Sequence, residues 1–427
     1  MFHFQKSICF LLLSAALCGS AAPKFYFRTT RVPADGFAKP GERIAFTAEL
    51  IKDGAPAALP FQAQLTVEGK DVVVKKGNGK ISMETTAPSC GFVYFSANYI
   101  PEGQKRSVTP PNINSVAVNP EQIRQGMPEP SDFDAFWKAA RKELAAIPMN
   151  PTLKRVPVTD PKYQGKVECF EVRLDAPGGR RAFGYLCLPK NAAGKLPAVI
   201  RFDGAGIYKH SPEYRFAADG FLAFSVNAHG IEFGEQATEE ELLSKLKKER
   251  YYTVLGWDDP EKVYFRHMLL RDLRALEYLK SRPEWNGKDL ICYGSSQGGA
   301  QSLAVAGLSP EVTFCYAGVP GLCNHGGIEK KQARGWPGNF PWNAKTKRTA
   351  GYFDNCSFAR RLRCPVLVTA AWHDFLTKPS SVYAAWNNIT SPKELRPFPN
   401  AGHWPAIRDT EDYARNEVRK HLKGQAK

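Results

Sequence analysis

The sequence predicts an α/β fold, a doubly wound and mostly parallel sheet, preceded by a small all-β sandwich domain. Three observations lead to this prediction. Apolar residues alternate with period two before residue 115, short apolar strands alternate with helical stretches after residue 166, and a proline-rich segment separates the two regions. A chain of 427 residues is long enough for two or three domains.

The first 22 residues are predicted to be a signal peptide. Lys6 supplies a positive charge, residues 8–17 form an apolar stretch of the expected length, and small residues at 19–22 offer a cleavage site. We therefore expect export to the periplasm or the extracellular space. A buried first helix is the alternative, and Leu17 is a poor fit to the small residue that lipidation of Cys18 would require.

Residues 23–115 are predicted to form the sandwich, which we expect to be immunoglobulin-like. Apolar side chains occupy every second position of residues 44–50 and 61–67, and residues 92–99 form a further strand-like run. Turn residues such as Asp53-Gly54 separate these runs. The region carries no recognisable catalytic constellation, so we expect a spacer, a docking module or part of an oligomer contact.

Residues 116–427 are predicted to form the α/β domain that carries the chemistry. Five prolines within residues 110–130 mark a linker, and Ser131 is expected to be the N-cap of the first helix, which Pro148 ends. The apolar face of this helix comprises Phe133, Phe136, Trp137, Ala140 and Leu144.

Apolar strands and helices then alternate along the chain. The predicted strands are residues 198–202, 221–226, 290–293, 313–316 and 366–370, and the predicted helices between them include 271–280 and 298–308. This order favours a mostly parallel sheet covered on both faces. Because ligands of such sheets bind at the carboxyl ends of the strands, those ends are where we expect the chemistry.

Ser296 is the candidate nucleophile. It lies in Gly294-Ser295-Ser296-Gln297-Gly298, which fits the pattern G-x-S-x-G between an apolar strand and a helix-forming run. The two glycines allow the strand to turn sharply into the helix, and the turn presents the serine hydroxyl above the sheet. A structural turn is the alternative, since glycine and serine are common turn residues.

A serine hydroxyl needs a base to remove its proton. Asp374 and His403 follow Ser296 in the order serine, acid, histidine that is typical of this nucleophile turn. Both are expected in loops at the carboxyl ends of strands, Asp374 after residues 366–370 and His403 after a further short strand. We therefore expect His403 to be the base and Asp374 its orienting carboxylate. The competing histidines are His373, His421 and His325, the last of which could line the substrate site.

Two backbone N–H groups are expected to stabilise the oxyanion that acyl transfer creates. One belongs to Gln297, directly after the nucleophile, and the other to Ala205 in the loop of residues 203–206. A phosphate-binding loop is disfavoured there because a third glycine and a G-K-[ST] ending are missing.

The cysteines do not define a metal site. Without Cys9 and Cys18 of the leader, eight remain; Cys292 is expected to be a buried free thiol. Bridges within Cys315, Cys323, Cys356 and Cys364 are possible in an exported protein. With no C-x-x-C and no histidine cluster, we expect neither a metal nor an organic cofactor.

The net charge of +16 allows an anionic partner. Its basic residues are scattered, and the densest run, residues 245–250, closely follows acidic residues 239–241, as on a solvated helix face. We therefore expect no nucleic-acid partner. Beyond the leader no apolar run approaches the about 18–20 residues of a membrane span.

At these residues the chain resembles the acetyl xylan esterase and cephalosporin-C deacetylase family of α/β-hydrolases, carbohydrate esterase family 7. The similar stretches are residues 133–137, 258–260 with 264–266, 294–299, 319–323, and Asp374 followed by 379–387, which reads PSSVYAAWN. The resemblance implies deacetylation of acetylated sugars, with Ser296, Asp374 and His403 as the triad.

Two stretches depart from the pattern of this family. Residues 228–231 (AHGI) stand where it usually has Arg-Gly-Gln, and Trp404 stands where a glutamate follows the histidine. Both departures affect the expected pocket shape and substrate.

The sequence thus predicts a secreted serine esterase that removes acetyl groups from acetylated oligo- or polysaccharides of the xylan type. Residues 232–259 are expected to form a cap or an oligomer contact, and a homo-oligomer is possible. Another hydrolase on the same scaffold, such as a dienelactone-type enzyme or a peptidase, is the alternative. A non-catalytic carbohydrate-binding protein is the other class that remains open.

Overall fold

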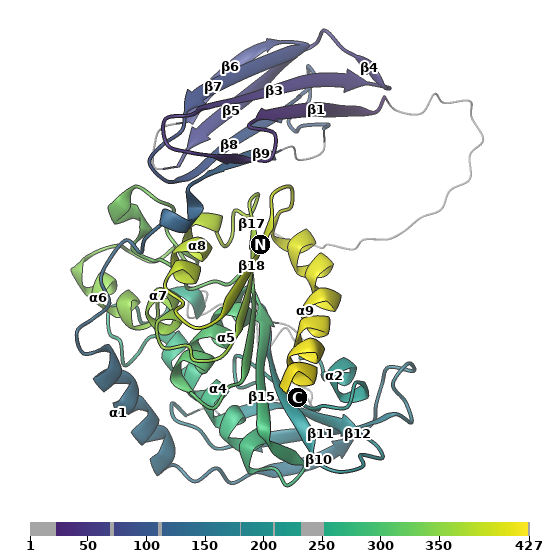
Figure 1. The fold of residues 1–427 in the computed structure, drawn as a ribbon, viewed down its shortest axis with the longest axis vertical. Helices are drawn as coiled ribbons and strands as arrows, with labels where there is room; N and C mark the ends of the chain where they lie inside the picture. Colours follow the sequence, from purple (N-terminus) through teal and green to yellow (C-terminus); the bar gives the residue numbers. More distant parts are fainter. Residues whose placement is uncertain are drawn as a thin grey trace, which may run out of the picture.

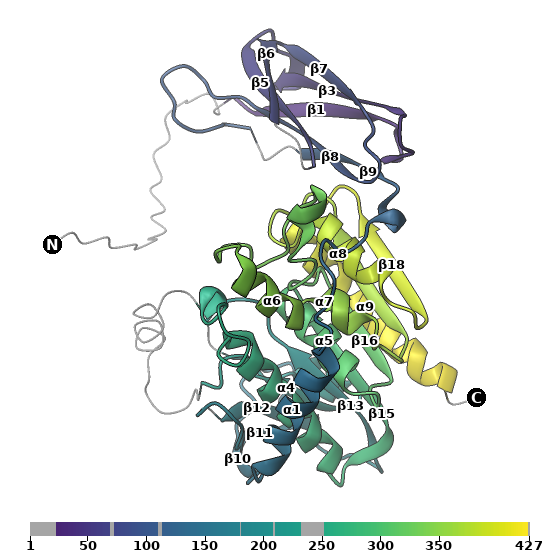
Figure 2. The same cartoon turned by 90° about the vertical axis from the view of Figure 1, so that its left-hand side faces the viewer.

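The computed structural model describes residues 23–68, 72–109, 113–179, 181–207, 210–231 and 252–425. The predicted signal peptide and most of the predicted cap, residues 232–251, lie outside the described residues. Two bodies make up the described chain. Figures 1 and 2 both show an all-β body stacked on one end of a larger α/β body.

The all-β body consists of two sheets that share an apolar core. One sheet has the order β1-β3-β4 with β7 also paired to β3, and the other has the order β2-β9-β8-β5-β6. Its strands are β1 (Phe25–Val32), β2 (Phe37–Ala38), β3 (Arg43–Lys52), β4 (Ala55–Pro56), β5 (Pro60–Val67), β6 (Val72–Asn78), β7 (Lys80–Thr86), β8 (Gly91–Asn98) and β9 (Ile113–Val118). Alternate residues of β3 and β5 face the core, where Phe46 and Phe95 stack at 5.3 Å.

The chain passes to the α/β body through η1 (Pro120–Gln122) and α1 (Phe133–Ala146). Helix α1 buries four of the five predicted apolar residues, and Phe136 is partly buried. The predicted N-cap is wrong, because Asp132 and not Ser131 precedes the first residue of the helix. The side chain of Asp132 makes no capping hydrogen bond and instead accepts one from the hydroxyl of Tyr352 at 2.6 Å. A tertiary contact has replaced the local cap.

Nine strands form the central sheet of the α/β body. Their order is β10-β11-β12-β14-β13-β15-β16-β17-β18. The strands are β10 (Thr152–Val156), β11 (Val167–Leu174), β12 (Ala182–Pro189), β13 (Leu196–Phe202), β14 (Leu222–Val226), β15 (Trp285–Ser295), β16 (Phe314–Gly318), β17 (Val366–Ala371) and β18 (Lys393–Phe398). The strands from β14 to β18 are parallel, whereas β10, β11 and β12 pair antiparallel at one edge.

Helices cover both faces of this sheet. They are α2 (Tyr214–Ala218), α4 (Tyr264–Ser281), α5 (Gln297–Leu308), α6 (Ala344–Tyr352), α7 (Asn355–Ala359), α8 (Pro379–Asn387) and α9 (His403–Gln425), with short turns η2 (Tyr252–Val254) and η3 (Gly327–Lys330). In β13, Ile200 packs in the cluster with α4 and α5, whereas Val199 packs in the cluster with α2 and α9. Figure 1 shows these two layers on opposite sides of the sheet. Burial on both faces explains the continuous apolar strands.

The eight cysteines in the described ranges are free thiols, and all but Cys90 are buried. The suggested bridges among the four later cysteines are therefore absent from this part of the chain. Cys315 lies inside strand β16, and the thiol of Cys323 donates to the carbonyl of Gly321 at 3.1 Å. Burial raises the pKa of both thiols well above the usual value. Across the described ranges, no helix combines the length and apolar character that a bilayer crossing requires.

Candidate active site

Ser296 occupies a strained position between β15 and α5. Its φ of 60° and ψ of −122° lie outside the regions that L-residues favour. The turn leaves no room for side chains on either flank. A Cβ on Gly294 would lie 2.5 Å from the carbonyl carbon of Gly298, and a Cβ on Gly298 would lie 2.3 Å from the carbonyl oxygen of Phe202. The two glycines of the motif are thus required by close backbone approach.

The structure brings Ser296, His403 and Asp374 into one hydrogen-bonded row. The Oγ of Ser296 lies 3.0 Å from Nε2 of His403, and Nδ1 of the same ring lies 2.6 Å from Oδ2 of Asp374. Asp374 is 1% exposed and His403 is 6% exposed. A base at hydrogen-bond distance from a serine, itself oriented by a buried acid, is the arrangement that activates a hydroxyl.

The loop after β17 holds the carboxylate in place. The N–H groups of Leu376 and Thr377 donate to Oδ1 of Asp374 at 2.8 and 2.9 Å, and the hydroxyl of Thr377 donates to Oδ2 at 2.8 Å. The sequence analysis missed Thr377. Its position three residues after the acid, in the same short loop, is the signal that could have indicated it.

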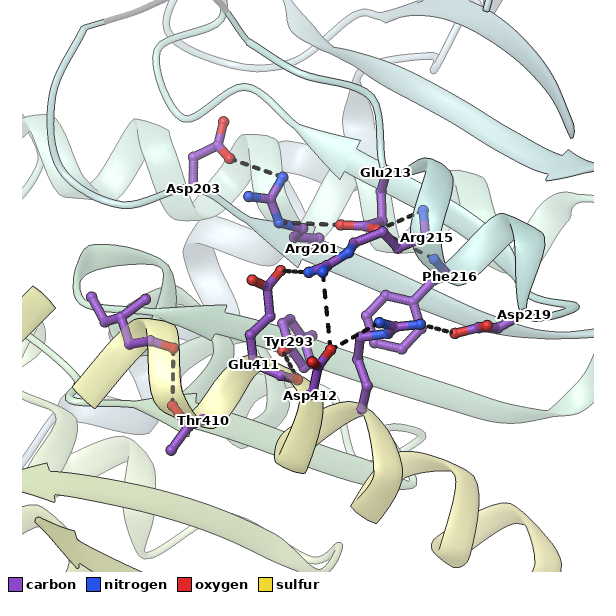
Figure 3. A network of polar contacts seen from close by, with 12 residues as sticks. Arg201, Asp203, Glu213, Arg215, Phe216, Asp219, Tyr293, Thr410, Glu411 and Asp412 are labelled. Atoms are coloured by element: carbon purple, nitrogen blue, oxygen red, sulfur yellow. Dashed lines mark hydrogen bonds and ion pairs between the residues drawn. The ribbon is translucent and has the colours of Figure 1, made fainter. Parts of the chain in front are cut away.

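The sequence analysis placed His403 in a loop, but it is the first residue of α9. Ion pairs fix that helix against α2, as Figure 3 shows. Arg215 pairs with Glu411, and Arg415 binds Asp219 at 2.5 Å. Because the base stands at the start of α9, these contacts also fix the imidazole relative to the sheet.

The competing histidines lie elsewhere. His325 is buried against the ring of Trp257 and does not line the cavity at Ser296, and burial lowers its pKa to about 4. His421 packs on Phe314 far along α9. His373 lies beside the interface with the all-β body, and burial lowers its pKa to about 4 as well.

A cavity of about 460 Å³ opens above Ser296. Gly204 and Ala205 of the loop after β13 line it together with the serine, so the predicted oxyanion loop does face the nucleophile. Gln297 is the first residue of α5, and N–H groups in the first turn of a helix have no acceptor within it. Apolar walls come from Trp336, Leu376, Trp404 and Ile407.

A chain of hydrogen bonds supports the oxyanion loop from behind. The N–H of Gly206 donates to the hydroxyl of Tyr252 at 3.2 Å, and that hydroxyl donates to Oε1 of Gln297 at 2.6 Å. The side-chain amide of Gln297 donates to Oε1 of Gln301 at 3.5 Å. The side-chain amide of Gln301 in turn donates to Oδ2 of Asp272 at 2.7 Å. Burial raises the pKa of Asp272 to about 7. None of these side chains except that of Gln297 belongs to a sequence motif.

The strand that leads into this loop is also fixed by charge. Figure 3 shows Arg201 between Asp203 and Glu213, at 3.5 and 3.3 Å. His210 also pairs with Asp203. The Nε2 atom of His229 lies 2.8 Å from the carbonyl oxygen of Gly206. His229 belongs to the stretch that departs from the family pattern. The departure therefore places an imidazole behind the oxyanion loop.

The fold is α/β-hydrolase-like, and the comparisons that follow define the class of protein as a carboxylic ester hydrolase. A family model described as acetyl xylan esterase (AXE1) matches residues 120–335 and 338–423. This chain belongs to the acetyl xylan esterase family, which confirms the resemblance stated from the motifs.

Similar proteins extend this comparison. Acetyl esterase Axe7A of Xylanibacter ruminicola is 32% identical over 389 residues, which cover 87% of this chain and 85% of that protein. An acetyl xylan esterase from Paenibacillus sp. R4 superimposes with a TM-score of 0.60 at 22% identity, covering 70% of this chain and 98% of its own. Acetyl xylan esterase 1 from Thermoanaerobacterium sp. JW/SL YS485 gives a TM-score of 0.58 at 23% identity, covering 71% and 97%. The two structures show the shared fold.

In the described ranges, no three His, Cys, Asp or Glu side chains are grouped so that they could hold a metal ion.

Proposed function

We propose that this protein is an exported serine esterase that removes acetyl groups from acetylated xylan or xylo-oligosaccharides. Ser296 is the nucleophile, His403 the general base and Asp374 the carboxylate that orients the base. The observation that carries the proposal is the row of contacts from Ser296 through His403 to Asp374, at 3.0 and 2.6 Å. Membership of the acetyl xylan esterase family supports the substrate class.

In the first half of the reaction, the Oγ of Ser296 attacks the acetyl carbonyl while Nε2 of His403 takes its proton. Asp374 stabilises the imidazolium that forms. The backbone N–H groups of Gln297 and Ala205 stabilise the oxyanion of the tetrahedral intermediate. That intermediate collapses when His403 returns the proton to the sugar oxygen, which leaves as an alcohol and leaves an acetyl-serine behind.

In the second half, a water molecule attacks the acetyl-serine with His403 again as the base. The same two N–H groups stabilise the second oxyanion. Collapse releases acetate and restores the hydroxyl of Ser296, so the cycle needs no redox partner. Beside Ser296, the cavity of about 460 Å³ presents apolar side chains such as Trp336 and Leu376 that can contact an acetyl methyl group, and Arg201 and Glu411 also line it.

The test is acetate release from acetylated xylo-oligosaccharides, alongside p-nitrophenyl esters of two to eight acyl carbons and an acetyl amide. We expect acetate release and activity that falls as the acyl chain lengthens, all lost in Ser296→Ala. Preference for longer acyl chains, for a lactone or for the amide would instead favour another hydrolase on this scaffold. Retention of xylan without any hydrolysis would favour a carbohydrate-binding protein.

Export and the identity of the first domain belong to the same proposal. The charged, apolar and small segments within residues 1–22 support export. The two sheets of β1 to β9, with their shared apolar core, support a separate immunoglobulin-like domain, whose last strand extends past the predicted boundary at residue 115 to Val118. Amino-terminal sequencing of the secreted protein tests the first point, and a cut near residue 22 is the expected result.

A further inference from the structure

A second cavity, of about 800 Å³, lies between the two bodies. The all-β body contributes Tyr26, Thr29 and Asn114 to its lining, and the α/β body contributes His373, Asn400 and Trp404. We call it the interbody groove. Figure 1 shows the all-β body above α8 and the start of α9, which is the end of the sheet where the catalytic cavity opens.

We propose that the interbody groove binds the neutral sugar chain beyond the acetylated residue, with the all-β body as one wall of the substrate site. The inference rests on the proposed function and deepens it, because it assigns a binding role to a region outside the family match, which begins at residue 120.

Continuity with the catalytic cavity is the first argument. His403 and Trp404 line both cavities, so the groove begins at the base itself. A sugar chain whose ester carbonyl reaches Ser296 can therefore continue across Trp404 into the groove.

The chemistry of the boundary is the second argument. The Trp404 side chain is 68% exposed, and its ring stands edge-on to His403 at 5.2 Å. Phe375 and Leu376, at 54% and 48%, are exposed in the loop beside it. Clustered exposed apolar side chains at the mouth of a cavity mark a binding surface, and a flat indole suits the apolar face of a sugar ring.

Two amide groups supply hydrogen-bond donors inside the groove. Nη1 of Arg31 donates to Oδ1 of Asn114 at 3.1 Å and to Oδ1 of Asn400 at 3.2 Å. This contact joins the two bodies and orients both amides with their oxygens toward the arginine. Within the described ranges neither Nδ2 group has a hydrogen-bond partner, so both are free to donate to sugar hydroxyls.

The charges of the lining side chains indicate which kind of sugar chain the interbody groove can bind. The lining contains no Asp, Glu, Lys or Arg within the described part of the chain. Burial holds the pKa of His373 near 4, so this ring is neutral at neutral pH. The amide and aromatic side chains of this lining suit the hydroxyls of a neutral oligosaccharide, and Arg31 contacts the lining through the oxygens of its two amides.

The wall formed by the all-β body is already in place. Glu68 of that body is half-buried and accepts hydrogen bonds from the N–H of Ala333 at 2.8 Å and from the hydroxyl of Ser380. Phe37 packs edge-on against Trp372 at 4.9 Å. Because the interface is preformed, a bound chain does not have to order it.

The test fills the groove from the all-β side. Thr29→Trp places an indole in the groove, and Thr30→Trp, one residue along β1 and on its opposite, exposed face, is the matched control. The kcat/KM is measured for singly acetylated xylobiose and xylohexaose and for p-nitrophenyl acetate, with Tm as the check on folding.

We expect the wild type to favour the hexamer over the dimer, and Thr29→Trp to lower kcat/KM for the hexamer by about tenfold. Hydrolysis of p-nitrophenyl acetate and the Tm stay at wild-type values, and Thr30→Trp changes nothing.

Equal kcat/KM for dimer and hexamer, or a hexamer value that is unaffected by Thr29→Trp, would overturn the groove while leaving the esterase intact. Equal losses in both tryptophan variants would overturn it as well. Failure of the wild type to release acetate from any oligosaccharide, with p-nitrophenyl acetate still cleaved, would instead overturn the proposed substrate and the groove's occupant with it.

Discussion

At the scale of single residues, the orientation of the proposed triad depends on the loop that follows Asp374. Three donors converge on this carboxylate, and one of them, the hydroxyl of Thr377, also lies 3.3 Å from Nδ1 of His403. The hydroxyl therefore stands where acid and base meet. It holds Oδ2 of Asp374, the oxygen to which the imidazole of His403 is hydrogen-bonded.

Thr377→Val removes that hydroxyl and keeps the shape of the side chain. We expect kcat for p-nitrophenyl acetate to fall about fivefold, which corresponds to the ~1 kcal/mol of one hydrogen bond, with KM unchanged. Steady-state kinetics check this, and Thr377→Ser is expected to restore most of the rate. A rise in KM at constant kcat would show that the residue shapes the cavity instead.

Asp272 makes stability depend on pH. Its pKa is about 7 in the folded protein because burial disfavours the carboxylate, against about 3.9 in an unfolded chain. Between these values the folded state binds the extra proton, so the free energy of unfolding falls as pH rises from about 4 to 7, by up to ~1.4 kcal/mol per pH unit.

Asp272→Asn should remove this dependence, since an amide oxygen can still accept from Gln301. Urea denaturation at pH 5 and pH 7 measures it, and the variant is expected to lose about 1–3 kcal/mol less than the wild type over that interval. Identical losses in both proteins would mean that Asp272 titrates normally.

At the scale of elements, the site depends on the junction of β15 and α5 with the end of β13. Gly298 lies against the backbone of Phe202 and Asp203, where the oxyanion loop begins. The spacing between α5 and that loop is therefore set by a residue without a side chain. One expected oxyanion donor, the N–H of Gln297, lies on the α5 side of this contact, and the other, the N–H of Ala205, lies on the loop side.

Gly298→Ala should push α5 and the loop apart. We expect kcat to fall by about a hundredfold as the donors lose their alignment, and stability to fall by about 1–3 kcal/mol. Kinetics and urea denaturation measure the two effects. Gly424→Ala is the control, because a Cβ there meets nothing within 4 Å. Normal kcat in Gly298→Ala would separate the loop from catalysis.

The elements also show what the sequence can predict. The strands could be predicted from their apolar runs. The nucleophile turn could be predicted because its two glycines are needed where a strand turns sharply into a helix. The Tyr252 network could not be predicted, because its partners lie up to 95 positions from one another along the chain and share no periodic pattern. The start of α9 at His403 was missed because Gly402 and Pro405 in the sequence favour a loop.

At the scale of the whole molecule, Glu68 joins the two bodies. Its carboxyl group is half-buried and accepts hydrogen bonds from the N–H groups of Phe92 and Ala333 and from the hydroxyl of Ser380, and loss of solvent raises its pKa. These acceptors satisfy donors that the interface would otherwise leave unpaired. The contact is polar and specific, so it fixes how the all-β body sits above the site.

Glu68→Ala should cost about 2–4 kcal/mol of stability, because it leaves buried donors unsatisfied. Glu68→Gln keeps an acceptor and should cost less than half of that. Urea denaturation followed by tryptophan fluorescence measures both, with Glu84→Ala, which breaks an exposed pair with Arg43, as the control. A stability equal to that of the control would mean that the interface does not depend on Glu68.

The measurement that tests the central claim most directly is hydrolysis of p-nitrophenyl acetate by the wild type and by Ser296→Ala, combined with labelling by a fluorophosphonate and peptide mapping. The account predicts rapid hydrolysis and a single adduct on Ser296 in the wild type, and neither in the variant. It also predicts that labelling of the serine is slowed strongly in His403→Ala. Equal activity in the wild type and Ser296→Ala, or an adduct on another residue, would contradict the assignment of Ser296 as the nucleophile.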